Sequence, residues 1–291
     1  MIEIKNLTKT YRGGVQALRG IELDIGAAMF GLIGPNGAGK TSLMRILAGL
    51  LRPTGGSAHV LGHDLATARG KQAVKSALGY LPQELALYPD LTASEFLDYL
   101  AILKGVTDAG ARRRQIAELL ELVRLDDVAH RQLKTFSGGM RRRAGIAQAL
   151  LGDPKLIIVD EPTAGLDPEE RVRFRNLLSD TAARCTVILS THIIEDISHS
   201  CNDLAVLHGG RVLFRGSPRD LIAQARDRVW LINTAGERPE AGLSIVSTLQ
   251  QMDGVQYRVL GAPDARHAAR PVEPSLEDGY IWLMEQSRKA G

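Results

Sequence analysis

The pattern of apolar and polar positions divides the chain into regions of different structure. In the first 33 residues, short apolar runs alternate with turns in IEIKNL, GIELDI and AMFGLI, which predicts a small sheet that leads into a central strand. From about 94 to 151 the apolar positions follow a helical period. The runs KLIIVD, CTVILST and DLAVLHGGRVLFRG come next and are separated by helical segments. This alternation is typical of an α/β core with a parallel sheet.

The helical region contains two predicted amphipathic helices. Thr92 and Glu95 have the spacing of a capping box at the start of the first helix. Each helix has one apolar face, which we expect to be buried. The faces consist of Phe96, Leu97, Leu100 and Leu103 in the first helix and of Ile116, Leu119, Leu120 and Val123 in the second.

The chain changes character from about residue 222. Clear periodicity is lost around NTAGERPEAG and returns in SLEDGYIWLMEQ, and prolines stand at 239, 263, 271 and 274. We therefore expect a small appended domain over residues 226–291, after a larger domain over residues 1–225.

Composition and charge narrow the classes of function. With 291 residues, of which 44% are hydrophobic, the chain can bury a substantial core. Lys and Arg number 36 and Asp and Glu 33, so the net charge of +3 does not indicate a nucleic-acid-binding protein. The arginine triplets at 112–114 and 141–143 are interpreted as solvated helix faces, because successive helical residues point about 100° apart.

Cysteine usage and hydropathy point to the cytoplasm. Cys185 and Cys201 lack metal-ligand spacing, as expected in a reducing compartment. The first residues lack the apolar segment of a signal peptide, and no apolar run approaches the roughly 18 residues of a membrane-spanning helix. We expect any work at a membrane to be done from outside the bilayer.

A phosphate-binding loop follows the third strand-like run. Gly34, Gly39, Lys40 and Thr41 match the pattern G-x-x-x-x-G-K-[ST], between an apolar strand over 30–33 and a predicted helix over 42–51. Glycines let backbone N–H groups fold around a phosphate, and the helix N-terminus adds partial positive charge. Lys40 is expected to reach the β- and γ-phosphates and Thr41 to bind Mg²⁺.

A second signal is the apolar run KLIIVDEP, which ends in Asp160 and Glu161. A buried parallel strand delivers its last side chains to the edge of the sheet where ligands bind. Asp160 is a candidate Mg²⁺ ligand and Glu161 a candidate for polarising a water against the γ-phosphate. Taken alone, the pair is equally compatible with a turn or a helix cap.

Six motifs in order carry a resemblance. GPNGAGKT, YLPQE, FSGGM, LIIVDEP, AGLD and STH, over residues 34–192, resemble the Walker A, Q-loop, signature, Walker B, D-loop and H-loop of an ATP-binding cassette (ABC) ATPase. The resemblance covers residues 1–225. It implies an α/β P-loop fold with a parallel core sheet, an antiparallel β subdomain and a helical signature subdomain over about 84–152, followed by a small α+β C-terminal appendage.

The resemblance also implies a nucleotide site. Gln83, Glu161 and His192 match the catalytic positions, Tyr11 resembles the aromatic residue that stacks on adenine, and Thr41, Gln83 and Asp160 match the Mg²⁺ ligands. Taken alone, Gln83 is equally compatible with an ordinary loop residue and His192 with a structural one. The phosphate-binding positions are Gly34, Pro35, Asn36, Gly37, Ala38, Gly39, Lys40, Thr41 and Ser42.

The signature helix has a start suited to binding an anion. Ser137 is a good N-cap, and Gly138 and Gly139 permit close backbone approach. In the family these three residues bind the γ-phosphate of ATP held by a second cassette, and Asp167 of the D-loop couples the two sites. The helix is expected to pack through Met140, Ala144, Ala147 and Leu151.

Two residues depart from the commonest signature, since Phe136 and Met140 replace Leu and Gln. Similar SGGM signatures are known in cassettes of ABC-2 type exporters, and the tail PVEPSLEDGYIWLM resembles the end of drug-export cassettes. The resemblance therefore implies an ATP-hydrolysing, exporter subunit at the inner face of the cell membrane. Its partners would be a second cassette, identical or paralogous, and a separate permease that docks near ELALYPDLTASEF.

Two alternatives remain open from the sequence. A soluble ABC ATPase acting on ribosomes, DNA or iron-sulfur assembly is one, although each motif occurs once here and about a hundred residues separate Walker A from the signature. An importer ATPase is the other, although its tail is usually longer.

Overall fold

The computed structural model describes all residues except 27, 163–166, 240–241, 265–267 and 291. The chain folds as two compact units. The first consists of Met1–Asn202 with Leu207–Val212, and the second of Asp203–Val206 with Leu213–Gly291. None of the described helices combines the length and apolar character needed to cross a membrane.

An antiparallel sheet forms first, in the order β2-β1-β4-β5. Its strands are β1 (Ile2–Thr10), β2 (Gln16–Ile25), β4 (Gly55–Val60) and β5 (His63–Asp64). Ile2 pairs with Ile25 and Ile4 with Leu23, and all four side chains are buried because alternate residues of a strand share a face. This sheet confirms the predicted antiparallel β region.

A second sheet has the order β10-β9-β3-β8-β7-β6. Its strands are β3 (Met29–Ile33), β6 (Leu78–Leu81), β7 (Leu156–Asp160), β8 (Thr186–Thr191), β9 (Asp203–His208) and β10 (Arg211–Gly216). The neighbours β3–β8, β8–β7 and β7–β6 are parallel, and every residue of β3, β7 and β8 is buried. The carboxyl ends of these strands therefore meet at one edge, where ligands of such sheets bind.

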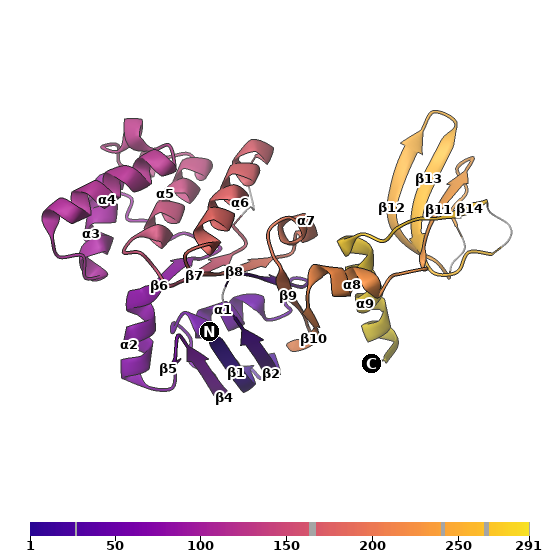
Figure 1. The fold of residues 1–291 in the computed structure, drawn as a ribbon, viewed down its shortest axis with the longest axis horizontal. Coiled ribbons are helices and arrows are strands. Elements are labelled where there is room, and N and C mark those ends of the chain that lie inside the picture. The colour runs from indigo at the N-terminus through magenta and orange to yellow at the C-terminus, as the bar shows by residue number, and fades with distance from the viewer. Residues whose placement is uncertain (27, 163–166, 240–241, 265–267, 291) are drawn as a thin grey trace. The chain divides into compact units, whose positions relative to one another are not determined.

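The first unit also contains helices, some of which pack on this sheet. They are α1 (Lys40–Leu47), α2 (Ala68–Ala77), α3 (Ala93–Leu103), α4 (Ala109–Leu122), α5 (Gly138–Leu150), α6 (Pro168–Ala182) and α7 (Ile194–Ser198). Figure 1 shows α3, α4 and α5 grouped together, and these three helices pack on one another. This arrangement confirms the predicted helical region around the signature.

Most local predictions for the helices hold. Thr92 and Glu95 form the expected capping box, in which Glu95 N donates to Thr92 Oγ1 at 3.2 Å and Thr92 N to Glu95 Oε2 at 2.8 Å. The apolar face of α4 is buried as predicted. The prediction for Leu103 is wrong, since its side chain is 65% exposed. Ala101 is buried in α3 instead, because it lies four residues after the buried Leu97 and therefore on the same helical face.

The helix after the phosphate loop differs at both ends from the predicted 42–51. It begins at Lys40 and ends at Leu47, with Ala48 as its C-cap. Gly49 follows with φ of 67°, a left-handed conformation that commonly terminates helices.

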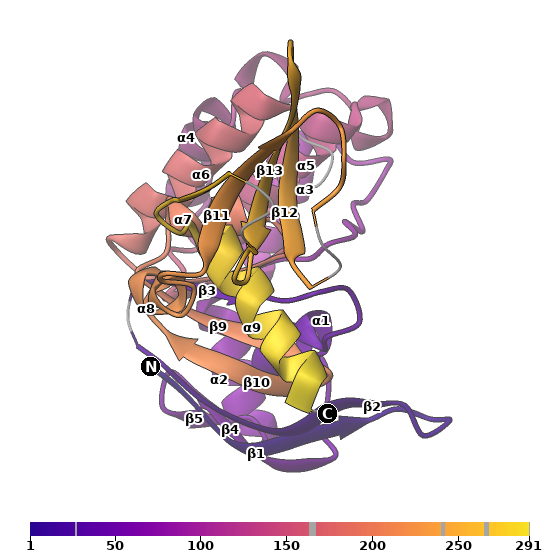
Figure 2. The ribbon, with the colours of Figure 1, turned by 90° about the vertical axis from the view of Figure 1, so that its right-hand side faces the viewer.

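Among its described residues, the part of the second unit after β10 contains a four-stranded antiparallel sheet and two helices. The sheet has the order β12-β13-β11-β14, and its core consists of Ile232, Val255, Tyr257 and Val259. Figure 2 shows β11, β12 and β13 side by side. This unit confirms the predicted α+β appendage. Its elements are α8 (Pro218–Ala223), β11 (Val229–Thr234), β12 (Ser244–Gln251), β13 (Gly254–Leu260), β14 (Ala269–Pro271) and α9 (Leu276–Ala290).

Two close contacts hold α9 within the second unit. Asp278, which is fully buried, accepts from Arg258 Nη2 at 2.6 Å and from Ser275 N at 2.6 Å. Gly279 lies against α8, because a Cβ built on it would stand 2.2 Å from the carbonyl oxygen of Leu221. The start of α9 is thus tied to β13 and α8 at once.

Candidate functional site

The phosphate loop runs from the end of β3 to the start of α1. Gly34 and Gly39 are required by close backbone approach: a Cβ at Gly34 would stand 2.1 Å from Leu207 O and one at Gly39 2.4 Å from Ala17 O. Gly39 also has a left-handed φ of 104° directly before α1. The backbone therefore turns tightly here and presents the N-terminus of α1. Between the two glycines lie Pro35, Asn36, Gly37 and the buried Ala38.

Lys40 lies inside this loop rather than in solvent. Its ammonium nitrogen Nζ donates to Gly34 O at 2.6 Å and to Pro35 O at 3.3 Å, and it stands 3.5 Å from Glu161 Oε1. Only 6% of the Lys40 side chain is exposed. A buried, charged donor surrounded by backbone oxygens is suited to transfer its hydrogen bonds to phosphate oxygens.

Glu161 joins two of the predicted site residues. Its Oε1 faces Lys40, and its Oε2 stands 2.6 Å from His192 Nδ1. Glu161 has a left-handed φ of 49°, a conformation that costs of the order of 1–3 kcal/mol in a non-glycine residue. The hydrogen bond from Glu161 N to Ser190 O, at 2.8 Å, helps to hold it. Strain of this kind is typical of functional sites.

Asp160 is the last residue of β7 and is fully buried. Neither of its carboxylate oxygens has a hydrogen-bond partner among the described residues. Burial raises the pKa of the Asp160 carboxyl group, and the nearby hydroxyls of Thr41 and Ser190 oppose this rise. Neither hydroxyl makes a hydrogen bond of normal geometry to the carboxylate. A buried carboxylate without partners is costly unless another group satisfies it.

The chemistry of these oxygens fits Mg²⁺, which binds through one or two carboxylates together with water and phosphate oxygens. Asp160 and the half-buried Thr41 supply protein oxygens next to the phosphate loop. The described residues contain no cluster of three or more His, Cys, Asp or Glu side chains that could hold a metal alone.

Gln83 is connected to these residues through its backbone. It follows β6 and Pro82, and its side chain is exposed. Its carbonyl oxygen accepts from Arg142 Nη1 at 3.1 Å. The structure thus brings Lys40, Glu161 and His192 into contact, while it leaves the Gln83 side chain in solvent.

Tyr11 lies over the start of α1. Its hydroxyl is 2.9 Å from Ser42 Oγ, and Lys9 Nζ is 5.2 Å from the centroid of its ring. The ring remains accessible, because 39% of Tyr11 is exposed. An accessible aromatic face beside the phosphate loop is compatible with stacking on a base.

The signature helix α5 begins as predicted. Ser137 is its N-cap and accepts from Met140 N at 3.2 Å. A Cβ added at Gly138 or Gly139 would meet no atom of the described chain within 4 Å. Nothing in the described part of the chain therefore explains these glycines, and the helix start is open to another molecule.

The packing of α5 is largely as predicted. Ala144, Ala147 and Leu151 are buried, whereas Met140 is only half-buried. Phe136, which replaces the commoner Leu, is 3% exposed and so forms part of the core. Its larger side chain therefore has a packing role.

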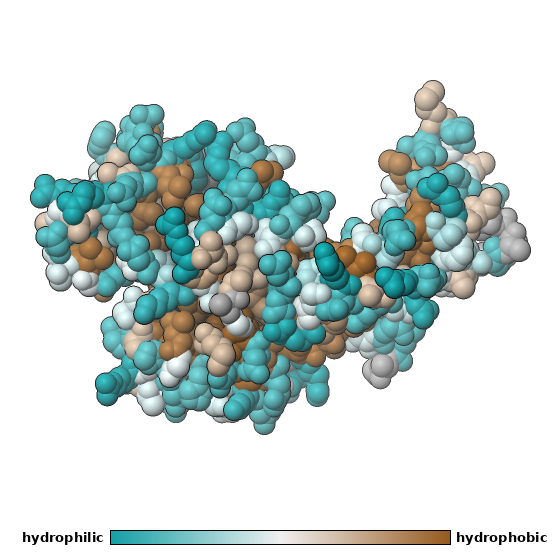
Figure 3. Space-filling view, in the orientation of Figure 1, coloured by the Kyte–Doolittle hydropathy of each residue, from teal (hydrophilic) through white to brown (hydrophobic). Residues whose placement is uncertain are grey.

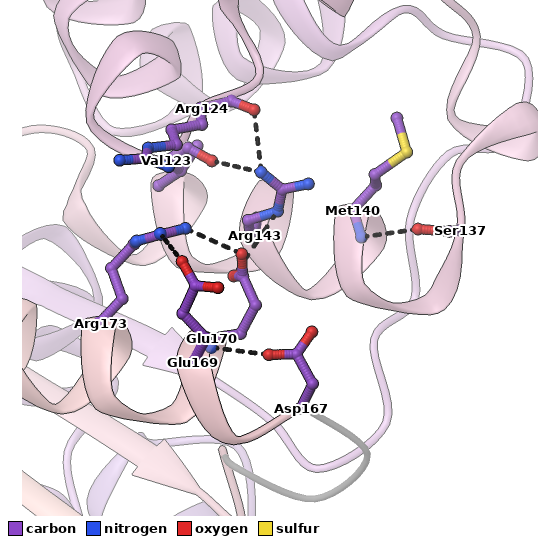
Figure 4. A network of polar contacts seen from close by, with 9 residues as sticks. All are labelled: Val123, Arg124, Ser137, Met140, Arg143, Asp167, Glu169, Glu170 and Arg173. Carbon is purple, nitrogen blue, oxygen red and sulfur yellow. Dashed lines mark hydrogen bonds and ion pairs between the residues drawn. The ribbon is translucent and has the colours of Figure 1, made fainter.

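Asp167 is the N-cap of α6 and accepts from Glu170 N at 2.8 Å, as Figure 4 shows. Figure 4 also shows Arg143 of α5 bound to the carbonyl oxygens of Val123 and Arg124, and 3.9 Å separate Arg143 Nε from Glu170 Oε2. The rest of the predicted AGLD motif, residues 164–166, lies outside the described residues. Asp167 thus starts a helix that is tied to α5.

Sequence reasoning missed Arg142. The interpretation of the triplet 141–143 as a solvated face is wrong for this residue, which is 7% exposed and donates to backbone carbonyls near Gln83 and Glu161. A signal was present: Gly145 and Ala149 follow Arg142 at helical spacing and are buried, which places Arg142 on the buried face of the helix. In the other triplet, Arg112 is also largely buried and donates to Asp98 at 2.6 Å.

Comparisons with known proteins agree with this geometry. The family model described as "ABC transporter" matches residues 18–164. The uncharacterized ABC transporter ATP-binding protein YxlF of Bacillus subtilis is 35% identical over 80% of this chain and 76% of its own length. The Nod factor export ATP-binding protein I of Cupriavidus pinatubonensis is 40% identical, over 76% and 68%.

Two further comparisons extend the likeness. The linearmycin resistance ATP-binding protein LnrL of Bacillus subtilis is 34% identical over 89% of this chain and 83% of its own. Among solved structures, the dimeric post-hydrolysis state of the ATP-binding cassette MJ0796 bound to ADP and Pi has a TM-score of 0.70 at 28% identity, covering 75% of this chain and 98% of that one.

Proposed function

The chain belongs to the ABC transporter family as an ATP-binding subunit, and we propose that it hydrolyses ATP to drive export. In this proposal it is an ABC-2 type cassette that acts through a permease on a separate polypeptide. The observation that carries the proposal is the contact of Glu161 with both Lys40 and His192, beside the unpartnered Asp160. Relatives named for Nod factor export and linearmycin resistance support the direction of transport.

The site residues act on ATP in the following way. The loop from Gly34 to Ser42 surrounds the phosphates, and the Lys40 ammonium exchanges the carbonyl oxygens of Gly34 and Pro35 for phosphate oxygens. Asp160 and Thr41, joined by Gln83 once its side chain turns inward, would hold Mg²⁺, which would neutralise charge on the phosphates. Tyr11 offers its exposed ring to adenine.

Hydrolysis requires a base aimed at the attacking water. In this structure Glu161 is engaged with Lys40 and His192. Once phosphate oxygens engage Lys40, the Glu161 carboxylate is free to accept a proton from water, and His192 is placed to contact the γ-phosphate. The strained Glu161 backbone keeps the carboxylate at the end of β7.

Two cassettes form one working unit in this proposal. The open N-terminus of α5 at Ser137–Gly139 supports it, because free N–H groups and a helix dipole attract the γ-phosphate of ATP held by a second copy or a paralogue. Asp167, at the start of α6, couples the two sites. The solved cassette MJ0796 is described as dimeric, which is consistent with this arrangement.

A Glu161→Gln variant tests the dimer. It keeps the shape of the side chain and removes the base, at a cost of about 10²- to 10⁴-fold in rate, so ATP should accumulate between two cassettes. Size exclusion with ATP should then show a dimer, with the permease attached if the isolated chain is too weak. Gly139→Asp in the same background should abolish it by placing a carboxylate against the γ-phosphate. A dimer that persists with Gly139→Asp would contradict the proposed role of α5.

The permease surface is proposed around α3. Tyr88, Tyr99 and Ile102 are 50%, 43% and 50% exposed, and the rings of Tyr88 and Tyr99 pack edge to face with centroids 5.6 Å apart. A cavity of about 870 Å³ lies between α3 and α4 and includes Tyr99 and Ile102 in its lining. Figure 3 shows hydrophobic surface over α3 within a largely hydrophilic face. Exposed aromatic and apolar side chains of this kind favour a protein interface.

Co-purification with the permease tests this surface. Tyr99→Glu should release the neighbour-encoded permease and leave ATP binding by the chain unchanged. Val172→Glu is the control, because Val172 is an apolar residue of similar exposure, at 45%, on α6. Retention of the permease by Tyr99→Glu would refute this placement.

We further propose that the cassette works in the cytoplasm, peripheral to the inner face of the membrane, with residues 226–291 as an accessory domain for docking or regulation.

A further inference from the structure

Arg142 occupies an unusual position in the signature helix. It follows the N-cap Ser137 by five residues, and its side chain leaves α5 on the buried side. All three guanidinium nitrogens donate to backbone carbonyls. The bonds are Nε to Pro162 O at 2.9 Å, Nη1 to Pro82 O and Gln83 O at 3.1 Å each, and Nη2 to Glu161 O at 2.7 Å and Asp160 O at 3.4 Å.

These five acceptors come from two separate segments. Pro82 and Gln83 follow β6, and residues 160–162 end and follow β7. Carbonyl groups beyond the end of a strand have no place in the ladder, and those that are buried need another donor. The planar guanidinium carries five N–H donors in a fixed fork, so one side chain can serve both segments, which an ammonium cannot do in the same geometry.

The charge of Arg142 also matters at this place. Burial lowers its pKa, while the negative charges of Asp160 and Glu161 oppose this. An arginine remains protonated under such conditions. A cation therefore lies close enough to interact with both carboxylates, and it is bonded to the carbonyl oxygen of the strained Glu161.

We propose that Arg142 is a positioning residue that links the signature helix to the loops bearing Gln83 and Glu161, so that the placement of α5 sets the placement of the hydrolytic carboxylate. This inference rests on the proposed ATPase function. It adds to that function a mechanical connection: through Arg142, the anion site at Ser137–Gly139 is rigidly connected to the hydrolytic site of the same chain. Arg142 acts through the two loops and touches no substrate itself.

Steady-state ATP hydrolysis by the full-length chain tests the inference. Arg142→Gln removes the fork and the charge, and Arg142→Lys keeps the charge and removes the fork. Both should lower kcat by about 10- to 100-fold, the loss expected from a displacement near 1 Å at the reacting centre, with KM and the Kd for ATP unchanged. Arg114→Gln is the control, because Arg114 is the exposed member of the other triplet.

A double-mutant cycle separates positioning from general destabilisation. If Arg142 acts partly through Gln83, then Arg142→Gln should lower kcat less in a Gln83→Ala background than in the wild type. Losses that multiply, or a wild-type kcat for Arg142→Gln, would overturn the inference while leaving the ATPase assignment intact. Loss of the fold in both Arg142 variants, seen by circular dichroism, would assign the residue to stability and overturn it as well. A wild-type chain that does not hydrolyse ATP would overturn the proposed function and the inference together.

Discussion

Replacing Asp278 by Asn should destabilise the second unit selectively. The Asp278 carboxylate is fully buried. It accepts a charge-assisted hydrogen bond from the guanidinium of Arg258 and two further hydrogen bonds from the backbone N and the Oγ of Ser275. Asparagine keeps the shape but removes the charge and turns a donor toward Arg258. Breaking a buried pair costs about 3–5 kcal/mol; we expect the lower end, about 3 kcal/mol, because 22% of the Arg258 side chain is exposed.

The chain offers a selective assay for this loss. Its two tryptophans, Trp230 and Trp282, both lie in the second unit, and Trp282 packs under Arg228 with 4.5 Å between the guanidinium carbon and the ring centroid. Tryptophan fluorescence therefore reports unfolding of this unit. For a domain of this size, 1 kcal/mol shifts Tm by roughly 4–8 °C, so Asp278→Asn should lower the fluorescence-detected Tm by at least about 12 °C.

The pH dependence provides an internal check. Burial by itself raises the pKa of Asp278, but hydrogen bonds from Arg258 and Ser275 outweigh it and the net pKa is lowered. A carboxyl with a lowered folded-state pKa stabilises the fold above its unfolded pKa, and this stabilisation is lost as the pH falls through the folded value. The wild type should therefore lose stability in acid more steeply than Asp278→Asn. Glu277→Gln, at the exposed neighbouring position, is the control. An unchanged Tm for Asp278→Asn would refute the reasoning.

Two further predictions concern packing and burial. Gly279→Ala should lower the same fluorescence-detected Tm, because the added Cβ would stand 2.2 Å from Leu221 O; a wild-type Tm would contradict this contact. Burial lowers the pKa of Lys104 to about 8, so between pH 8 and its unfolded pKa of 10.5 the unfolded chain binds more protons and stability rises with pH. Urea unfolding over this range should therefore show the wild type gaining stability relative to Lys104→Met, and a difference that stays flat would show that folding does not lower the pKa of Lys104.

Part of the site was predictable because local spacing determines it. The phosphate loop follows from the spacing of Gly34, Gly39 and Lys40: the two glycines leave no room for a Cβ, and the ammonium of Lys40 bonds within the loop. Ser137 as a helix cap follows from local hydrogen bonding in the same way. Features that depend on three or four neighbouring residues were therefore accessible from the sequence.

Contacts between distant segments were not predictable in the same way. Arg142 looked like its exposed neighbour Arg141, and its burial depends on the loops after β6 and β7, about 60 and 20 residues away in sequence. The pairing of Arg258 with Asp278 likewise depends on how α9 meets β13. Leu103 has the apolar character of a core residue, yet it lies on the outer side of α3. Which face of a helix is covered depends on tertiary packing, which periodicity alone does not specify.

The proposed ATPase activity is tested most directly by the rate of MgATP hydrolysis of the purified full-length chain. The wild type is compared with Lys40→Ala and Glu161→Gln, and the permease is added if the isolated chain is slow. Lys40→Ala removes charge-assisted hydrogen bonds to phosphate worth about 1.5–3 kcal/mol each, and Glu161→Gln removes the proposed base. We expect ATP-dependent phosphate release by the wild type and none above background in Lys40→Ala, with retained ATP binding but lost turnover in Glu161→Gln. Wild-type turnover in either variant would contradict the account.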